Sequence, residues 1–155
     1  MDFPLIYHRR RVIQIKLVSN FRLIIKHVLT HTLHYLPSMN KLIACLGASA
    51  VGLGALGAHT LALYLDKSSI ESFKTAVFYH IIHTLALLAI RNYPHSSLTV
   101  WLWSIGIFLF SGSIYLLSTD TFMGVDLHFL GPITPVGGLF LIAGWLSLIV
   151  PSVNK

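Results

Sequence analysis

The run GLGALGAH, residues 52–59, decides how this chain folds, because it places small residues at most positions inside a long apolar segment. Just upstream, small residues recur every four positions, at Ala44, Ala48 and Gly52. On a helix this spacing puts all three on one face. In a membrane, such a face lets neighbouring backbones approach closely, so that dispersion contacts hold the helices together. The run therefore predicts a spanning helix built for close packing, with the other apolar segments as its partners.

Composition points to lipid as the main solvent of the chain. Of its 155 residues, 55% are hydrophobic and 10% are charged, with a mean hydropathy of +0.75. Soluble domains carry about 25% charged residues. Seven of the eleven lysines and arginines precede position 42. This asymmetry favours contact with anionic lipid headgroups, or a topology signal, over binding to nucleic acid.

Four apolar segments are long enough to cross a bilayer, given a rise of 1.5 Å per helical residue and a core of about 30 Å. They cover about residues 42–65, 73–91, 98–118 and 131–150. Between them we expect a polar break at 66–72, a short turn at 92–97 and a loop at 119–130. Trp101 and Trp103 fit an aromatic belt at the membrane surface. The predicted fold is an all-α integral membrane four-helix antiparallel bundle, with the first helix at its centre.

Residues 1–38 form a basic amphipathic extension outside the predicted transmembrane domain, which covers 39–155. Its charges at Lys16, Arg22 and Lys26 are too costly for a span. Three interpretations remain open: a helix lying in the membrane interface, a presequence, or a misassigned start with Met39 as the natural first residue.

Charge also predicts topology. Four spans place both termini on one side, and nine of the eleven basic residues fall on that side. The positive-inside rule then puts both termini in the cytoplasm. We expect a multi-pass protein of a bacterial inner membrane.

Each predicted span contains a motif that resembles the YgdD-like family of small inner-membrane proteins, whose eukaryotic relatives are small transmembrane proteins. The motifs are GALGAH at 54–59, TAVFYHIIHTLA at 75–86, LFSGSIY at 109–115, and ITPVGG at 133–138 with Gly144 and Trp145. His80 departs from the family pattern, in which glutamine is usual. The resemblance implies a four-helix membrane bundle and no established biochemical function.

Three histidines are the sharpest candidates for chemistry. His80 and His83 share a helix face, and His59 from the first span could join them around a metal ion or a haem. No acidic residue inside a span could hydrogen-bond a metal-binding imidazole and hold it in place. We therefore favour interhelical hydrogen bonding and expect no metal and no cofactor. Tyr79 and Thr134 are further candidates for polar or ligand contacts. Thr75, Tyr79 and His83 form a polar stripe that we expect to meet the serines of the third span.

Glycines and alanines are the predicted packing positions. Pro135 starts the fourth helix, and the following glycines leave room for a neighbour. The full set expected to support helix packing is Ala44, Ala48, Gly52, Gly57, Gly112, Gly137, Gly138 and Gly144.

Three classes of function fit this sequence. We favour a non-enzymatic membrane component that acts through helix packing or association, as a homo-oligomer or with a membrane-protein partner. The alternatives are a small permease or channel, and a haem- or metal-binding redox protein using His59, His80 and His83. The chain has no phosphate loop, nucleophile elbow or zinc-protease motif, so we predict that it is not an enzyme.

Overall fold

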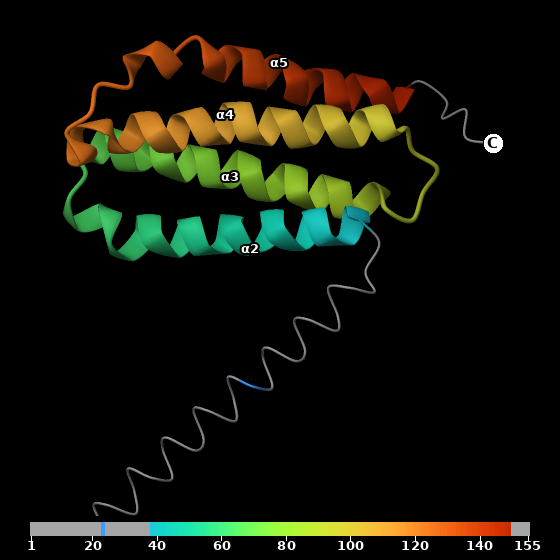
Figure 1. Cartoon of the computed structure of the whole chain (residues 1–155), viewed down its shortest axis with the longest axis horizontal. Helices are drawn as coiled ribbons and strands as arrows, with labels where there is room; N and C mark the ends of the chain where they lie inside the picture. The colour runs from blue at the N-terminus through green and yellow to red at the C-terminus, as the bar shows by residue number, and fades with distance from the viewer. Residues whose placement is uncertain (1–22, 24–37, 150–155) are drawn as a thin grey trace, which may run out of the picture. The chain divides into compact units, whose positions relative to one another are not determined.

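The computed structural model describes Leu23 and residues 38–149, and every regular element in this part of the chain is a helix. The long helices are α2 (Ser38–His59), α3 (Lys67–Ile90), α4 (Ser97–Met123) and α5 (Ile133–Leu146) (Figure 1). Short 3₁₀ turns occupy Leu61–Leu63, His128–Leu130 and Ser147–Ile149. With these turns included, four helices are long and apolar enough to cross a membrane. The predicted all-α, four-span fold is confirmed. Apart from Leu23 and Ser38, the residues of the predicted extension lie outside the described part of the chain.

Helix α3 begins six residues before the predicted span. The prediction of a polar break at 66–72 is therefore wrong, because most of this segment is helical. Asp66 caps the helix: its carboxylate accepts the backbone N–H of Ser69 at 2.9 Å and the Ser69 hydroxyl at 2.8 Å. An acceptor at this position satisfies a donor that the first turn leaves unpaired. The polar residues that follow Asp66 therefore form the first turns of the helix.

Because Asp66 caps α3 as a carboxylate, the stability of the fold should fall at acidic pH. The hydrogen bond from the Ser69 backbone holds the pKa of Asp66 below its ordinary value of 3.8. Because the folded-state pKa is lowered, the stabilisation is present above about pH 4 and is lost as pH falls through the folded value. Asp66→Asn keeps a capping oxygen but does not titrate. Thermal melts below about pH 4 should therefore fall less steeply for Asp66→Asn than for the wild type. Parallel slopes would contradict the cap's contribution.

Helix α4 runs five residues past the predicted end of its span, to Met123. It stops where Gly124 adopts a left-handed conformation with φ 66°, which glycine reaches without steric cost. The predicted loop at 119–130 is thus shortened from its start, and it ends in the 3₁₀ turn His128–Leu130. Membrane helices that extend into the headgroup layer carry polar residues in their last turns, which sequence hydropathy excludes from a span.

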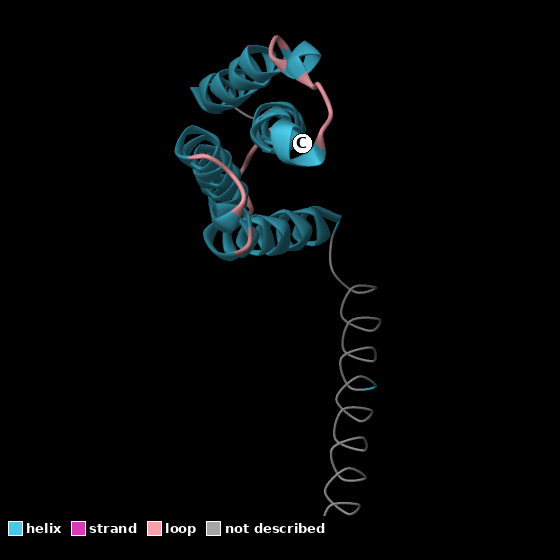
Figure 2. Ribbon diagram, turned by 90° about the vertical axis from the view of Figure 1, so that its left-hand side faces the viewer, coloured by secondary structure: helices cyan, strands magenta, loops and turns pink. Residues whose placement is uncertain are grey.

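The four helices lie in chain order, with α4 between α3 and α5 and with α2 on the far side of α3 (Figures 1 and 2). The prediction that the first helix is central is therefore wrong. A close helix pair needs smooth surfaces on both partners, and α4 and α5 supply them. A Cβ on Gly106 of α4 would lie 3.0 Å from the backbone nitrogen of Leu141, and one on Gly137 of α5 would lie 2.7 Å from the carbonyl carbon of Leu109.

Among the described residues, α2 packs through the side that carries its buried residues, Ile43, Ala50 and Gly57. A Cβ on Gly57 would lie 2.8 Å from the ring of Phe73, which is 2% exposed. Phe73 packs with Leu61 and Ile70 in a buried cluster that ties the end of α2 to the start of α3. The rest of α2 is largely open.

Candidate functional site

Two buried histidines of α3 face the other helices, and His83 is the better connected of the two. Its Nδ1 lies 2.8 Å from the backbone oxygen of Tyr79, and the indole N–H of Trp145 on α5 donates to its Nε2 at 3.1 Å. A carbonyl can only accept and an indole N–H can only donate. The arrangement therefore fits a neutral ring with the proton on Nδ1 and the lone pair on Nε2. His83 thereby joins α3 to α5.

Aromatic rings surround this hydrogen bond. Trp103 of α4 is 0% exposed, and its ring centroid lies 6.2 Å from that of His83 and 4.9 Å from that of Trp145. The three rings meet edge to face, the geometry that the quadrupoles of aromatic rings favour. The belt position predicted for Trp103 is wrong, whereas Trp101 is 65% exposed. These rings form a junction of α3, α4 and α5.

His80 is buried but only partly paired. Its Nδ1 lies 3.3 Å from the hydroxyl of Tyr115 on α4, while its Nε2 has no hydrogen-bond partner among the described residues. Its backbone oxygen accepts the hydroxyl of Thr84 at 2.8 Å. Other buried polar atoms without a partner in the same part of the chain are Trp103 Nε1, Ser111 Oγ and Ser118 Oγ. Such atoms are infrequent in native proteins, so each one calls for an explanation.

Hydroxyl pairs tie α5 to α4 at both ends. Thr134 lies 2.7 Å from the hydroxyl of Ser113, and Ser147 lies 2.7 Å from that of Thr99. Each pair satisfies two hydroxyls that lipid could not. The candidate Thr134 thus bonds between helices, and the same residue also lines a pocket.

The other predicted site residues are more dispersed. His59 is exposed at the end of α2, and within the described residues no group of three His, Cys, Asp or Glu side chains is placed to hold a metal ion. Tyr79 is 39% exposed and stacks on His83. Thr75 is exposed and donates to the backbone oxygen of Glu71. The three-imidazole cluster considered for the redox alternative is not assembled in this structure.

The predicted packing residues fall into two groups. Gly57, Gly137 and Gly144 lie where a Cβ would collide with a neighbour; for Gly144 the neighbour is the ring of Trp103. Gly138 has ordinary contacts, and Gly112 has no heavy atom within 4 Å of a built Cβ. Gly52 likewise has no heavy atom within 4 Å of a built Cβ, and Ala44 and Ala48 are exposed. Gly106 was not among the predicted packing residues, although a glycine inside an apolar span indicates a possible close helix contact.

Four apolar helices with buried hydroxyls and histidines between them define a multi-pass helical membrane protein. The chain belongs to the family described as "Protein of unknown function (DUF423)", which matches residues 53–138. It is 39% identical to the UPF0382 membrane protein YwdK of Bacillus subtilis over 112 residues, covering 68% of this chain and 87% of the relative.

Relatives occur in both bacteria and eukaryotes. The UPF0382 membrane protein of Haemophilus influenzae is 36% identical, with 69% of this chain and 86% of the relative covered. UPF0382 membrane protein C1782.12c of Schizosaccharomyces pombe is 37% identical, with 69% and 94% covered. No solved structure matches the chain. The resemblance drawn from the motifs of the four spans is confirmed.

Proposed function

We propose that this protein is a non-enzymatic membrane component that acts through helix association, and that α2 carries the associating surface. The observation behind this proposal is that Ala44, Ala48 and Gly52 are exposed, with no heavy atom within 4 Å of a Cβ on Gly52. Lipid gives little drive for apolar helices to associate, so close backbone approach at small residues supplies much of it. A smooth face left open to lipid is suited to a partner helix.

The partner that fits this face is a second copy of the chain. All copies inserted with one topology present α2 in the same direction. A two-fold axis along the membrane normal then brings Ala44, Ala48 and Gly52 of one copy against the same residues of the other, and such self-complementary contacts are the commonest form of homo-oligomer. Small residues four apart are the pattern found at such parallel helix crossings.

Substituting Gly52 should weaken this association. In Gly52→Leu a bulky side chain would stand on the proposed contact face, where a Cβ meets no heavy atom within 4 Å. The exposed Cys45, adjacent to Ala44, provides a native crosslinking handle. With a short bismaleimide added to native membranes, we expect the crosslinked dimer to fall about tenfold relative to the wild type, the effect of about 1.4 kcal/mol.

Two controls accompany this measurement. Gly112→Leu makes the same change on α4, where a Cβ also meets nothing within 4 Å, and His59→Ala removes the ring at the end of α2. Both should crosslink like the wild type. Equal crosslinking in Gly52→Leu and the wild type, or none in the wild type, would rule out the α2 interface.

We further propose that the membrane is a bacterial inner membrane and that both termini lie in the cytoplasm, as the excess of basic residues on that side favours. The turn after α3 would then face the cytoplasm, and the loop after α4 would face outward. Tyr93 and Val125 are exposed in these two segments. In a Cys45→Ser background, an impermeant maleimide added to intact cells should label Val125→Cys but not Tyr93→Cys. The reverse labelling would invert the topology.

A further inference from the structure

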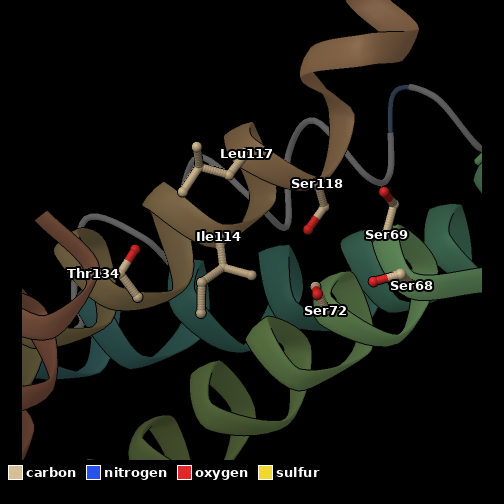
Figure 3. A pocket seen from close by; sticks show the side chains of 7 residues that line it. All are labelled: Ser68, Ser69, Ser72, Ile114, Leu117, Ser118 and Thr134. Carbon is tan, nitrogen blue, oxygen red and sulfur yellow. The ribbon is translucent and has the colours of Figure 1, made fainter. Parts of the chain in front are cut away.

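A pocket of about 280 Å³ opens where the start of α3, the end of α4 and the start of α5 come together. Most of its lining residues carry hydroxyls, and Ile114 and Leu117 are its apolar side chains (Figure 3). The five hydroxyl-bearing residues are Ser68, Ser69, Ser72, Ser118 and Thr134. These side chains converge from three helices, so the pocket is a product of the tertiary fold.

Ser118 distinguishes this pocket from an ordinary surface hollow. Its side chain is 5% exposed, and its Oγ has no hydrogen-bond partner within the described part of the chain. From α4 the hydroxyl is directed toward the side of α3 that carries Ser68 and Ser72 (Figure 3). A serine in a helix ordinarily bonds to a carbonyl one turn back, as Ser104 and Thr119 do on the same helix. The unused hydroxyl of Ser118 is available to a ligand in the pocket.

The helix lengths place the pocket near the edge of the hydrocarbon core, beside the glycerol layer of the lipid. Helix α4 has 27 residues and is about 40 Å long, which exceeds the hydrocarbon core of about 30 Å. Ser118 lies five residues, or about 8 Å, from the end of this helix. Ser68 and Ser72 belong to the first two turns of α3. A molecule in the pocket is therefore reached from the interface.

The charges around the pocket select a neutral ligand. None of the described residues that line it is ionised, so a cation in the pocket would have no carboxylate to bind. An anion is disfavoured because the carboxylate of Asp66 already occupies the donors of Ser69 at the start of α3. A serine or threonine hydroxyl has one donor hydrogen and two acceptor lone pairs, so it can both donate and accept. The pocket hydroxyls therefore suit a ligand group that can also donate and accept hydrogen bonds. Ile114 and Leu117 offer an apolar surface for a short carbon chain.

We propose that this pocket binds a neutral, hydroxyl-bearing group of the glycerol type. Two sources share this chemistry: the uncharged head of a membrane diacylglycerol, and free glycerol. Ser118 and Ser72 hydrogen-bond the ligand hydroxyls, and the carbon skeleton lies on Ile114 and Leu117.

Native mass spectrometry of the full chain, released from detergent with one added lipid at a time, tests the proposal. The wild type should retain dioleoylglycerol in preference to dioleoylphosphatidylcholine, which has no free hydroxyl. Ser118→Ala removes only the unpaired hydroxyl, and Ser72→Leu fills the pocket from an exposed position. Each should lower dioleoylglycerol retention about five- to tenfold, the loss expected for a hydrogen bond. Ser97→Ala, at the opposite end of α4, should retain it fully.

A competition arm separates the two sources. If free glycerol in large excess displaces dioleoylglycerol, the hydroxyl-bearing head alone is recognised; if it does not, the lipid is the ligand. If the wild type binds only free glycerol, and Ser118→Ala abolishes that binding, free polyol is the source. Equal retention of the two lipids without glycerol binding, or unchanged binding in both pocket variants, would overturn the proposal.

Discussion

Gly137→Ala should destabilise the protein by about 1–3 kcal/mol, the range for added methyl groups in a packed core. The new methyl would lie 2.7 Å from the carbonyl carbon of Leu109 and 2.7 Å from the Cα of Phe110. Both atoms are backbone, so no side chain can rotate away and the two helices must separate. The free energy of unfolding, measured by titrating SDS into mixed micelles, reports the change.

Gly138→Ala is the matched control, one position along the same helix. Its methyl would lie 3.6 Å from the ring of Phe110, which is an ordinary contact. Replacing a helical glycine by alanine otherwise favours the helix by up to about 1 kcal/mol. Gly138→Ala should therefore be neutral or stabilising. If the two variants change stability alike, the close approach of α4 and α5 at Gly137 is refuted.

The number and order of the helices could be predicted from sequence because crossing a bilayer requires about 20 apolar residues with few charges. The ends of the helices were harder to predict, because hydropathy indicates which residues cross the hydrocarbon core and not where a helix begins or ends. The first turns of α3 carry Lys67, Ser68, Ser69 and Glu71, so they fall outside the apolar stretch. Asp66 followed by Ser69 was a readable capping pattern, but it stands in a segment whose charges looked like a loop.

The neighbours of each helix could not be predicted in the same way. In lipid, the outer side of a helix is apolar and the buried side is largely apolar too, so hydrophobic periodicity separates the two sides poorly. Trp101 and Trp103 look equivalent in sequence, yet one is exposed and the other is fully buried. Likewise, small residues mark where a helix can be approached, but not by which partner: Gly137 meets α4, while Gly52 meets nothing within 4 Å.

The hydrogen bond between His83 and Trp145 joins residues 62 positions apart, which no local pattern could pair. Its strength is measurable with a double-mutant cycle of Trp145→Phe and His83→Leu. Trp145→Phe keeps an aromatic ring but leaves the buried Nε2 of His83 without a donor, which costs about 1–3 kcal/mol. His83→Leu removes the acceptor. In the double variant both the donor and the acceptor are gone, so no buried polar group is left without a partner.

We therefore expect the double variant to lose less stability than the sum of the two single variants, by about 0.6–1.7 kcal/mol, from the average to the maximum found for polar pairs in a membrane protein. Trp103→Phe is the comparison, because its indole N–H has no partner among the described residues and its ring still touches His83. Coupling of Trp103→Phe with His83→Leu should be smaller, since only ring packing is shared. Additivity of Trp145→Phe and His83→Leu within about 0.5 kcal/mol would show that the bond contributes nothing. Coupling confined to this pair would identify His83 as the polar link between α3 and α5, and would account for a histidine at this position without any ligand.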